Sequence, residues 1–125
     1  MGHTYRELRV WQESVEMSIH AYRLTQPFPQ EELYGLSNQI RRSAVSVSSN
    51  IAEGQGRLSK KDFRHFLSQA RGSLFEMETQ FVIASRLGYL SDSSLKAMLK
   101  QSGAVNAMLS GLMQSMLPPT EQRET

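Results

Sequence analysis

The sequence predicts an all-α fold, a single soluble four-helix bundle, and three observations lead to it. At 125 residues the chain is about one domain long. Apolar residues recur three and four positions apart in four long stretches, and no stretch shows the sustained alternation typical of strands. Proline or glycine separates each stretch from the next. The predicted helices span about residues 5–25, 30–53, 60–87 and 92–117.

The connections between these helices are short, so helices adjacent in sequence are expected to run antiparallel, in an up-down-up-down order. The repeated spacing of the apolar residues suits shallow, left-handed packing. Residues 1–119 therefore form one predicted domain, and the polar residues 120–125, which follow Pro118 and Pro119, form a predicted disordered tail.

The first two helices follow from their start and stop signals. Thr4 is suited to cap the first helix, with Glu7 completing a capping box, and Pro27 ends the segment. The second helix is expected to begin after Pro29 and to end at Gly54, the residue type favoured just past a helix C-terminus. The expected core stripe of the first helix is Leu8, Trp11, Val15, Ile19 and Tyr22. That of the second is Leu33, Leu36, Ile40, Ala44, Val47 and Ile51.

The last two helices carry similar signals. Ser59 is predicted to cap the third helix, with Leu58 and Phe63 as a hydrophobic staple, and Gly88 is predicted to stop it. Ser91 is predicted to cap the fourth helix. The expected core stripe of the third helix is Phe63, Phe66, Leu67, Ala70, Leu74, Met77, Phe81 and Ala84, and it runs on to Leu87. That of the fourth is Leu95, Met98, Leu99, Val105, Met108, Leu109, Leu112, Met113 and Met116.

Several classes of function are not expected from the composition. The chain has no cysteine, which excludes a disulfide, a thiolate metal site and a cysteine nucleophile. Its histidines, His3, His20 and His65, belong to no zinc or di-iron motif, so neither an enzyme nor a cofactor or metal site is expected. No apolar run reaches the roughly 18 residues of a membrane span, and the start lacks signal-peptide order. A cytoplasmic location without a membrane partner is therefore expected.

The candidate nucleic-acid-binding residues surround the start of the third helix. Between Arg41 and Arg71 there are seven basic and two acidic residues, whereas the rest of the chain has seven basic and ten acidic ones. Within this basic segment, Arg57, Lys60, Lys61 and Arg64 combine positive side chains with the free backbone N–H groups of a helix N-terminus, and both suit phosphate. The alternative is a solvated surface turn that keeps the protein soluble.

The candidate oligomer interface lies on the outer side of the third helix. Phe75 and Val82 are roughly 120–140° away from Ala70 on a helical wheel, outside the core stripe. Burying such a side chain contributes about 1.5–3 kcal/mol, so the pair predicts contact between copies of the chain. The alternative is that they are ordinary isolated surface residues. Small residues in the second helix suit close packing within the bundle or between subunits: Ser43, Ala44, Ser46, Ser48, Ser49 and Ala52.

Two pairs of polar residues in the second helix are expected to have structural roles. Asn50 and Glu53 lie one turn apart near its C-terminus, where the helix dipole disfavours a carboxylate unless a partner holds it. A structural polar junction is expected there, with a functional site as the alternative. Arg41 and Arg42 flank the core stripe and are expected to form ion pairs within or between subunits, for instance with Glu53, Glu76 or Glu78.

A long motif in the second helix carries a family resemblance. Residues 39–57 read QIRRSAVSVSSNIAEGQGR, in which the Asn-Ile-Ala-Glu-Gly string is the most specific part. Shorter likenesses elsewhere extend over almost the whole chain, including LRVWQ at 8–12, YGL at 34–36, ARGSLFE at 70–76 and LGYL at 87–90. The sequence resembles the bacterial four-helix-bundle proteins named for intervening sequences within 23S ribosomal RNA genes. Mild departures are Val47, where the family commonly has Ile, and Ser48, where it often has Pro or Ala.

The resemblance implies that four-helix bundles assemble as a homopentameric ring. A related group, the accessory proteins of diversity-generating retroelements, forms basic pentamers that bind nucleic acid and a reverse transcriptase. Many members have no assigned activity, and the family name describes a gene location. Two functions are therefore expected: a non-enzymatic pentamer that binds RNA or DNA through a basic surface, or a structural scaffold that recruits a protein partner without binding nucleic acid.

Overall fold

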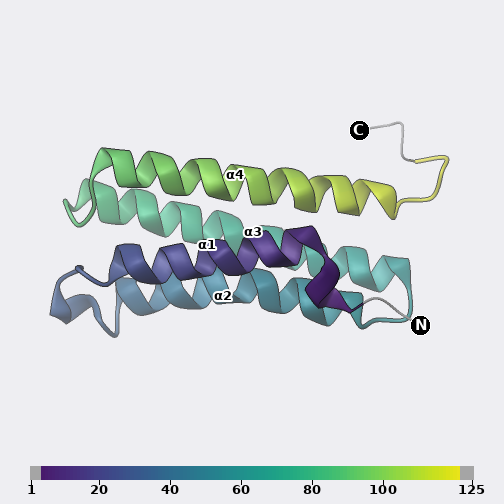
Figure 1. The fold of residues 1–125 in the computed structure, drawn as a ribbon, viewed down its shortest axis with the longest axis horizontal. Coiled ribbons are helices and arrows are strands. Elements are labelled where there is room, and N and C mark those ends of the chain that lie inside the picture. Colours follow the sequence, from purple (N-terminus) through teal and green to yellow (C-terminus); the bar gives the residue numbers. More distant parts are fainter. Residues whose placement is uncertain (1–3, 122–125) are drawn as a thin grey trace.

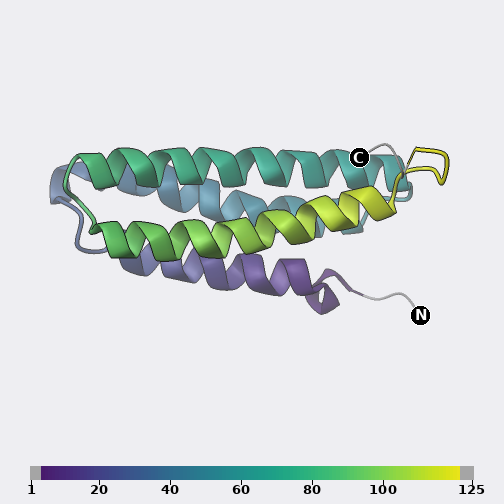
Figure 2. The ribbon, with the colours of Figure 1, turned by 90° about the horizontal axis from the view of Figure 1, so that it is seen from above.

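The computed structural model describes residues 4–121, which fold into four long α-helices without a strand. The helices are α1 (Arg9–Thr25), α2 (Leu36–Gln55), α3 (Lys60–Arg86) and α4 (Asp92–Ser115). Short 3-10 turns, η1 (Tyr5–Glu7) and η2 (Gln30–Glu32), precede α1 and α2. Consecutive helices lie side by side and antiparallel, with their connections at the two ends of an elongated bundle (Figures 1 and 2). The prediction of an all-α four-helix fold is confirmed.

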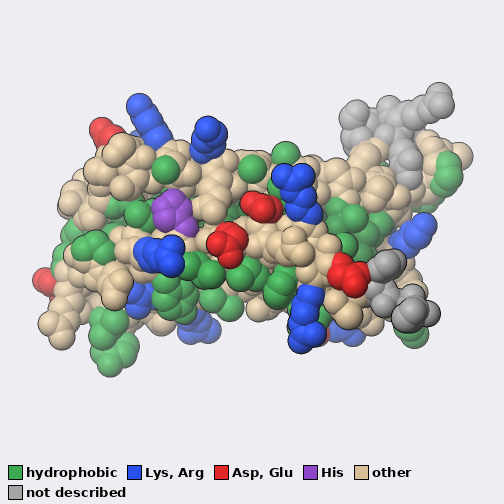
Figure 3. Space-filling model, in the orientation of Figure 1, with side chains coloured by type: hydrophobic (Ala, Val, Ile, Leu, Met, Phe, Trp, Pro, Cys, Tyr) green, Lys and Arg blue, Asp and Glu red, His purple; other side chains and the backbone are tan. Residues whose placement is uncertain are grey.

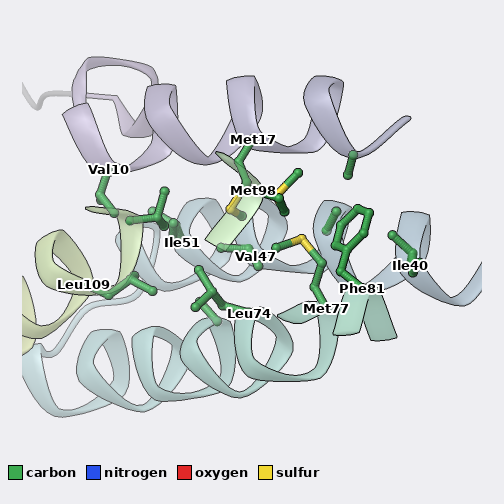
Figure 4. Packing of buried hydrophobic residues seen from close by; sticks show 14 of the residues in the cluster. Val10, Met17, Ile40, Val47, Ile51, Leu74, Met77, Phe81, Met98 and Leu109 are labelled. Carbon is green, nitrogen blue, oxygen red and sulfur yellow. The ribbon is translucent and has the colours of Figure 1, made fainter. Parts of the chain in front are cut away.

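The hydrophobic core lies between the four helices and runs along the bundle. Figure 4 labels its main members: Val10, Met17, Ile40, Val47, Ile51, Leu74, Met77, Phe81, Met98 and Leu109. Most inward residues of α3 and α4 match their predicted stripes, because they are buried or pack against the core. Phe66 and Leu99 are half-buried outside this core cluster, and Leu87, which follows α3, is 56 % exposed, so the stripe of α3 does not extend to Leu87. Of the four helices, α2 and α3 pack against each other most extensively.

The predicted core stripe of α1 is wrong at two positions. Ile19 is 39 % exposed and Tyr22 is 46 % exposed, whereas Met17 is fully buried. Ser18 is also buried, and its hydroxyl donates a hydrogen bond to the Ala44 carbonyl of α2 at 3.0 Å. Because this small polar side chain lies at the α1–α2 contact, the buried face of α1 is rotated away from Ile19 and Tyr22. Those residues then lie at the surface.

The start of α1 also differs from its prediction. The Thr4 side chain makes no capping hydrogen bond, so the predicted capping box with Glu7 is wrong. The Thr4 carbonyl instead accepts the Glu7 N–H at 3.1 Å and closes the 3-10 turn η1. The chain then extends at Leu8, whose partly buried side chain packs against the core, and α1 begins at Arg9. Packing of Leu8 therefore interrupts the helix that the local signal favoured.

The start of α2 is later than predicted. Residues 30–32 form η2, and α2 begins at Leu36, whose N–H donates to the Glu32 carboxylate at 3.1 Å. The other oxygen of the same carboxylate accepts a hydrogen bond from the Tyr89 hydroxyl at 3.0 Å. Glu32 thus joins the start of α2 to the α3–α4 connection. Leu33, which was expected in the core, lies before α2 and is 43 % exposed.

The end of α2 is also later than predicted. The helix continues through Gly54 to Gln55, so Gly54 is not the residue past its C-terminus. Gly54 is buried, and a Cβ at its position would lie 2.7 Å from the Phe66 Cβ and 2.9 Å from the Phe63 Cδ1. Its lack of a side chain therefore allows α2 to approach the beginning of α3 closely.

The predicted caps of α3 and α4 are confirmed, but the staple of α3 is wrong. Ser59 Oγ accepts the Asp62 N–H at 3.0 Å, and Ser91 Oγ accepts the Ser94 N–H at 3.2 Å. Leu58 is fully exposed, so it does not pack against the start of α3 as a staple would. Its position follows from the bend of residues 57–59, which connects two closely packed helices.

The end of α3 is a glycine-dependent turn, as predicted. Gly88 has a φ of 84°, in the left-handed region that favours glycine. Its N–H donates to the Ser85 carbonyl at 3.0 Å, and the Tyr89 N–H donates to the Ala84 carbonyl at 2.9 Å. These two bonds form a Schellman motif, which satisfies the last carbonyl groups of α3. At the chain end, residues 122–125 of the predicted disordered tail lie outside the described residues.

Candidate nucleic-acid interface

The candidate basic residues lie at the α2–α3 turn and in the first turns of α3. Lys60 and Lys61 are the first two residues of α3, immediately after the Ser59 cap. Both lysine side chains are exposed, and neither forms a hydrogen bond or ion pair with any residue of the described range 4–121. Two unpaired ammonium groups therefore lie beside a helix N-terminus, an arrangement that suits phosphate.

Arg57 at the same turn already has partners. Its Nη2 is 2.9 Å from Glu53 Oε1, and its guanidinium carbon lies 4.6 Å from the centre of the Phe66 ring. The Arg57 and Glu53 side chains are 44 % and 57 % exposed, so their ion pair is worth at most about 1 kcal/mol. Arg57 is therefore a positioned cation whose carboxylate partner a phosphate could replace at low cost.

Arg64 has a structural contact within the bundle. Its Nη1 donates to the Met116 carbonyl at 3.2 Å, just past the C-terminus of α4. A cation is favoured there, because helix C-terminal carbonyl groups carry partial negative charge. Arg64 thus joins the beginning of α3 to the end of α4. Of the four predicted residues, Lys60 and Lys61 are the two free of such internal contacts.

Asn50 and Glu53 do not bond to each other. Asn50 Nδ2 donates to the Ser46 carbonyl at 2.9 Å and to Ser46 Oγ at 3.0 Å, and Ser46 Oγ lies 2.9 Å from Ser73 Oγ of α3. Glu53 instead forms an ion pair with Arg57. This cation offsets the unfavourable position of a carboxylate near a helix C-terminus. Asn50 therefore belongs to a polar seam between α2 and α3, and Glu53 belongs to the basic turn.

Phe75 and Val82 lie on the outer side of α3. Phe75 is 46 % exposed, Val82 is half-buried, and the neighbouring Ile83 is 45 % exposed. The Phe75 side chain is thus available for a contact between copies of the chain, whereas part of the Val82 side chain is already covered by the bundle.

Arg41 forms no ion pair within the subunit among the described residues. Arg41 Nε donates to Thr25 Oγ1 at 2.9 Å, and the guanidinium carbon lies 4.9 Å from the centre of the Tyr22 ring. These contacts join α2 to α1 in place of a carboxylate. Arg42 is exposed and has no hydrogen-bond or ion-pair partner among residues 4–121, so an ion pair within the subunit is also absent there, and the pairing between subunits stays a prediction.

Sequence comparison and fold comparison agree on the relatives of this chain. A profile of the family described as 23S rRNA-intervening sequence protein matches residues 6–111. The chain belongs to this family. Its fold is similar to that of a protein of unknown function from the S23 ribosomal protein family of Bacteroides thetaiotaomicron, with a TM-score of 0.75 and 23 % sequence identity. The match covers 83 % of this chain and 97 % of the other, and no curated protein matches.

The structure of this chain has a surface feature that the sequence did not reveal. Two hollows of about 670 and 680 Å³ adjoin on the outer face of α2 and share Tyr34, Asn38, Arg42 and Ser46. We name them together the Arg42 cleft. The Arg41–Arg42 pair was its only sequence signal, because the 90 % exposure of Tyr34 depends on how the chain turns between η2 and α2.

A second depression lies between α1 and α2 and is mostly apolar. It has a volume of about 450 Å³, and its lining consists of Val15, Ile19, Tyr22 and Val45 together with Ser18, Arg23 and Ser48. We name it the α1–α2 groove. Its apolar residues include Val15, Ile19 and Tyr22, three that were expected in the core of α1, so the rotation of α1 created this surface.

Tyr89, which lies outside the candidate sites, has a shifted pKa. The hydrogen bond to the Glu32 carboxylate raises the pKa of Tyr89 above its ordinary value of 10.0, and partial burial of the phenol acts in the same direction. Within residues 4–121, no three His, Asp or Glu side chains gather in a way that could hold a metal ion. No helix in that range is long and apolar enough to span a membrane.

Proposed function

We propose that this member of the family is a non-enzymatic homopentamer that binds RNA or DNA through a basic surface. Its main contacts are Lys60 and Lys61, supported by Arg57. The observation that carries the proposal is that both lysines are exposed beside the N-terminus of a 27-residue helix and have no partner among residues 4–121. Cations in the first turn oppose the helix dipole, so an anion between them would relieve an unfavourable arrangement.

Assembly would multiply this weak site. The family resemblance implies five subunits, and the exposed Phe75 supplies an apolar contact on the outer side of α3. A ring repeats the two lysines five times, so contacts that are individually weak act together on one polyanion. The non-enzymatic part of the proposal rests on the sequence, in which no nucleophile–base pair or metal motif can be assembled.

Salt-dependent binding tests the nucleic-acid part. Fluorescence anisotropy with labelled RNA and DNA should show affinity that falls steeply between about 50 and 200 mM salt. The Lys60→Ala/Lys61→Ala variant should bind more weakly and with a smaller salt slope, because each lost phosphate contact lowers the slope by about one. Lys96→Ala/Lys100→Ala is the matched control, since it removes two exposed lysines from α4. Equal binding by the wild type and the Lys60/Lys61 variant, or no binding at about 50 mM salt, would contradict the proposal.

The second candidate function is a scaffold that recruits a protein partner and does not bind nucleic acid. The α1–α2 groove favours it, because exposed apolar side chains gathered in one depression are typical of protein-binding surfaces. An Ile19→Glu variant would then lose a specific co-purifying protein while the wild type binds no oligonucleotide. That pair of results would favour the scaffold over the first proposal.

A further inference from the structure

The Arg42 cleft brings exposed aromatic rings and arginine side chains together on the outer face of α2. Tyr34 is 90 % exposed and Tyr22 is 46 % exposed, and both line the hollow of about 670 Å³. In Figure 3, hydrophobic and basic side chains lie next to each other at the lower left of the molecule, around the start of α2. An aromatic ring as open as Tyr34 offers its face to a planar partner.

The lining of this hollow is cationic. It contains Arg41 and Arg42 but no Asp or Glu. Arg41 is fixed by its bond to Thr25 and its position over Tyr22, whereas Arg42 is exposed and unpaired among residues 4–121. The adjoining hollow contains one carboxylate, Glu76. A ligand of the cleft should therefore be anionic, and its negative charge should lie on the side of Arg42.

The size and polar groups of the cleft suit a nucleotide. A volume of about 670 Å³ lies within the range of roughly 300–1,000 Å³ that is usual for small-molecule sites. Asn38 and Ser49 are exposed in the same lining, where an amide and a hydroxyl can bond to the edge of a base. An aromatic ring, a free guanidinium and adaptable polar groups are the three contacts that single-stranded nucleic acids use.

We propose that the Arg42 cleft binds one nucleotide of a single-stranded nucleic acid, with the base stacked on Tyr34 and a phosphate on Arg42. A single strand is required, because the bases of a duplex are stacked on one another and their faces are unavailable. This inference rests on the proposed nucleic-acid function. It adds a second contact surface and a preference for single strands over duplexes.

The position of the cleft allows one strand to reach both sites. Arg42 and Glu53 are eleven residues apart in α2, about three full turns, so they lie on the same face roughly 16 Å apart. Glu53 holds Arg57, the first residue of the basic turn. A strand that lies along this face of α2 would therefore run from Tyr34 and Arg42 to Arg57, Lys60 and Lys61.

The test compares single strands with duplexes at low salt. The probes are fluorescein-labelled oligo-dT and oligo-U of about 12 nucleotides, and a duplex of the same length. Tyr34→Ala and Arg42→Gln should each weaken single-strand binding about fivefold or more and leave duplex binding within twofold, since one base stack is lost or misplaced. Tyr34→Phe keeps the ring and should restore single-strand binding. Arg86→Gln, the same charge change at an exposed arginine of α3, should have little effect.

The outcomes separate this inference from the proposed function. Wild-type binding to single strands that neither Tyr34→Ala nor Arg42→Gln weakens would overturn the inference and leave the Lys60/Lys61 site intact. Failure of the wild type to bind any probe would overturn both. A change in the mass of either variant in solution would show that the cleft is an interface between copies, which also overturns the inference. Tyr34 is almost fully exposed, so its variants should keep the fold.

Discussion

Gly54 of α2 lies directly against Phe66 of α3, so that a Cβ on the glycine would be only 2.7 Å from the Phe66 Cβ. Real Cβ atoms do not approach this closely, and the Phe63 Cδ1 would be 2.9 Å away as well. The close packing of α2 and α3 near the basic turn therefore depends on the missing side chain. Arg57 and Lys60 follow Gly54 in sequence by three and six residues. The contact between Gly54 and Phe66 therefore also fixes the position of the candidate site.

The first prediction concerns this contact. Gly54→Ala should lower the free energy of unfolding by about 1–3 kcal/mol, because the added methyl group must push the two helices apart. Gly72→Ala is the matched control, since Gly72 is in the middle of α3 with nothing within 4 Å of an added Cβ. That substitution should raise stability by about 0.5–1 kcal/mol through helix propensity. Urea denaturation of both variants checks the pair, and stabilisation by Gly54→Ala would refute the close contact.

The second prediction concerns helix capping. Ser59→Ala removes the oxygen that accepts the Asp62 N–H, so it should lower the free energy of unfolding by about 0.5–2 kcal/mol. Thr4→Ala should change it by less than about 0.5 kcal/mol, because Thr4 makes no side-chain capping bond. Thermal or urea unfolding of the two variants measures the difference. An equal loss in both would mean that Thr4 caps a helix in solution.

The contrast between these two caps illustrates what the sequence could predict. Local sequence signals were sufficient where the structure depends on residues within one helix or beside its ends. Examples are the Ser59 cap, the glycine turn at Gly88 and most of the apolar stripe of α3. They failed where packing between helices decided it. Leu8 breaks the first predicted helix because its side chain packs against the core, and α1 turns Tyr22 outward because Ser18 bonds to α2.

The candidate sites follow the same division. The exposed lysines at positions 60 and 61 could be inferred from charge and from the start of a helix. The contacts of Arg41 and Arg64 could not be inferred from local signals, because their partners are distant in sequence. Thr25 is 16 residues away from Arg41, and Met116 is 52 residues away from Arg64. The Arg42 cleft depends on the same long-range packing and on the turn at Tyr34.

The third prediction concerns pH. The pKa of Tyr89 is higher in the folded chain than its ordinary value of 10.0, because the neutral phenol donates to the Glu32 carboxylate. This bond should therefore contribute its full stability below about pH 10 and lose it as the pH rises through the folded pKa. Spectrophotometric titration should show one late-ionising tyrosine that is missing in Tyr89→Phe. The stability difference between wild type and variant should also shrink at alkaline pH; a difference that grows there would have the wrong sign.

The fourth prediction concerns self-association. Phe75→Glu should reduce the mass of the assembly in solution, because a carboxylate cannot be buried in an apolar contact without a partner. Leu58→Glu is the control, since Leu58 is fully exposed in the α2–α3 turn. Light scattering coupled to size exclusion distinguishes the two. An assembly that Phe75→Glu leaves intact would mean that another face, such as the α1–α2 groove, joins the subunits.

Native mass spectrometry in the presence of a short oligonucleotide tests the central claim most directly, because one spectrum gives both subunit number and bound ligand. The account predicts a species near 71 kDa, five times the 14.2 kDa chain, that carries oligonucleotide at low salt. The Lys60→Ala/Lys61→Ala variant should give the same assembly with less oligonucleotide bound. A monomer, or a wild-type assembly that stays free of oligonucleotide at every salt concentration, would contradict it.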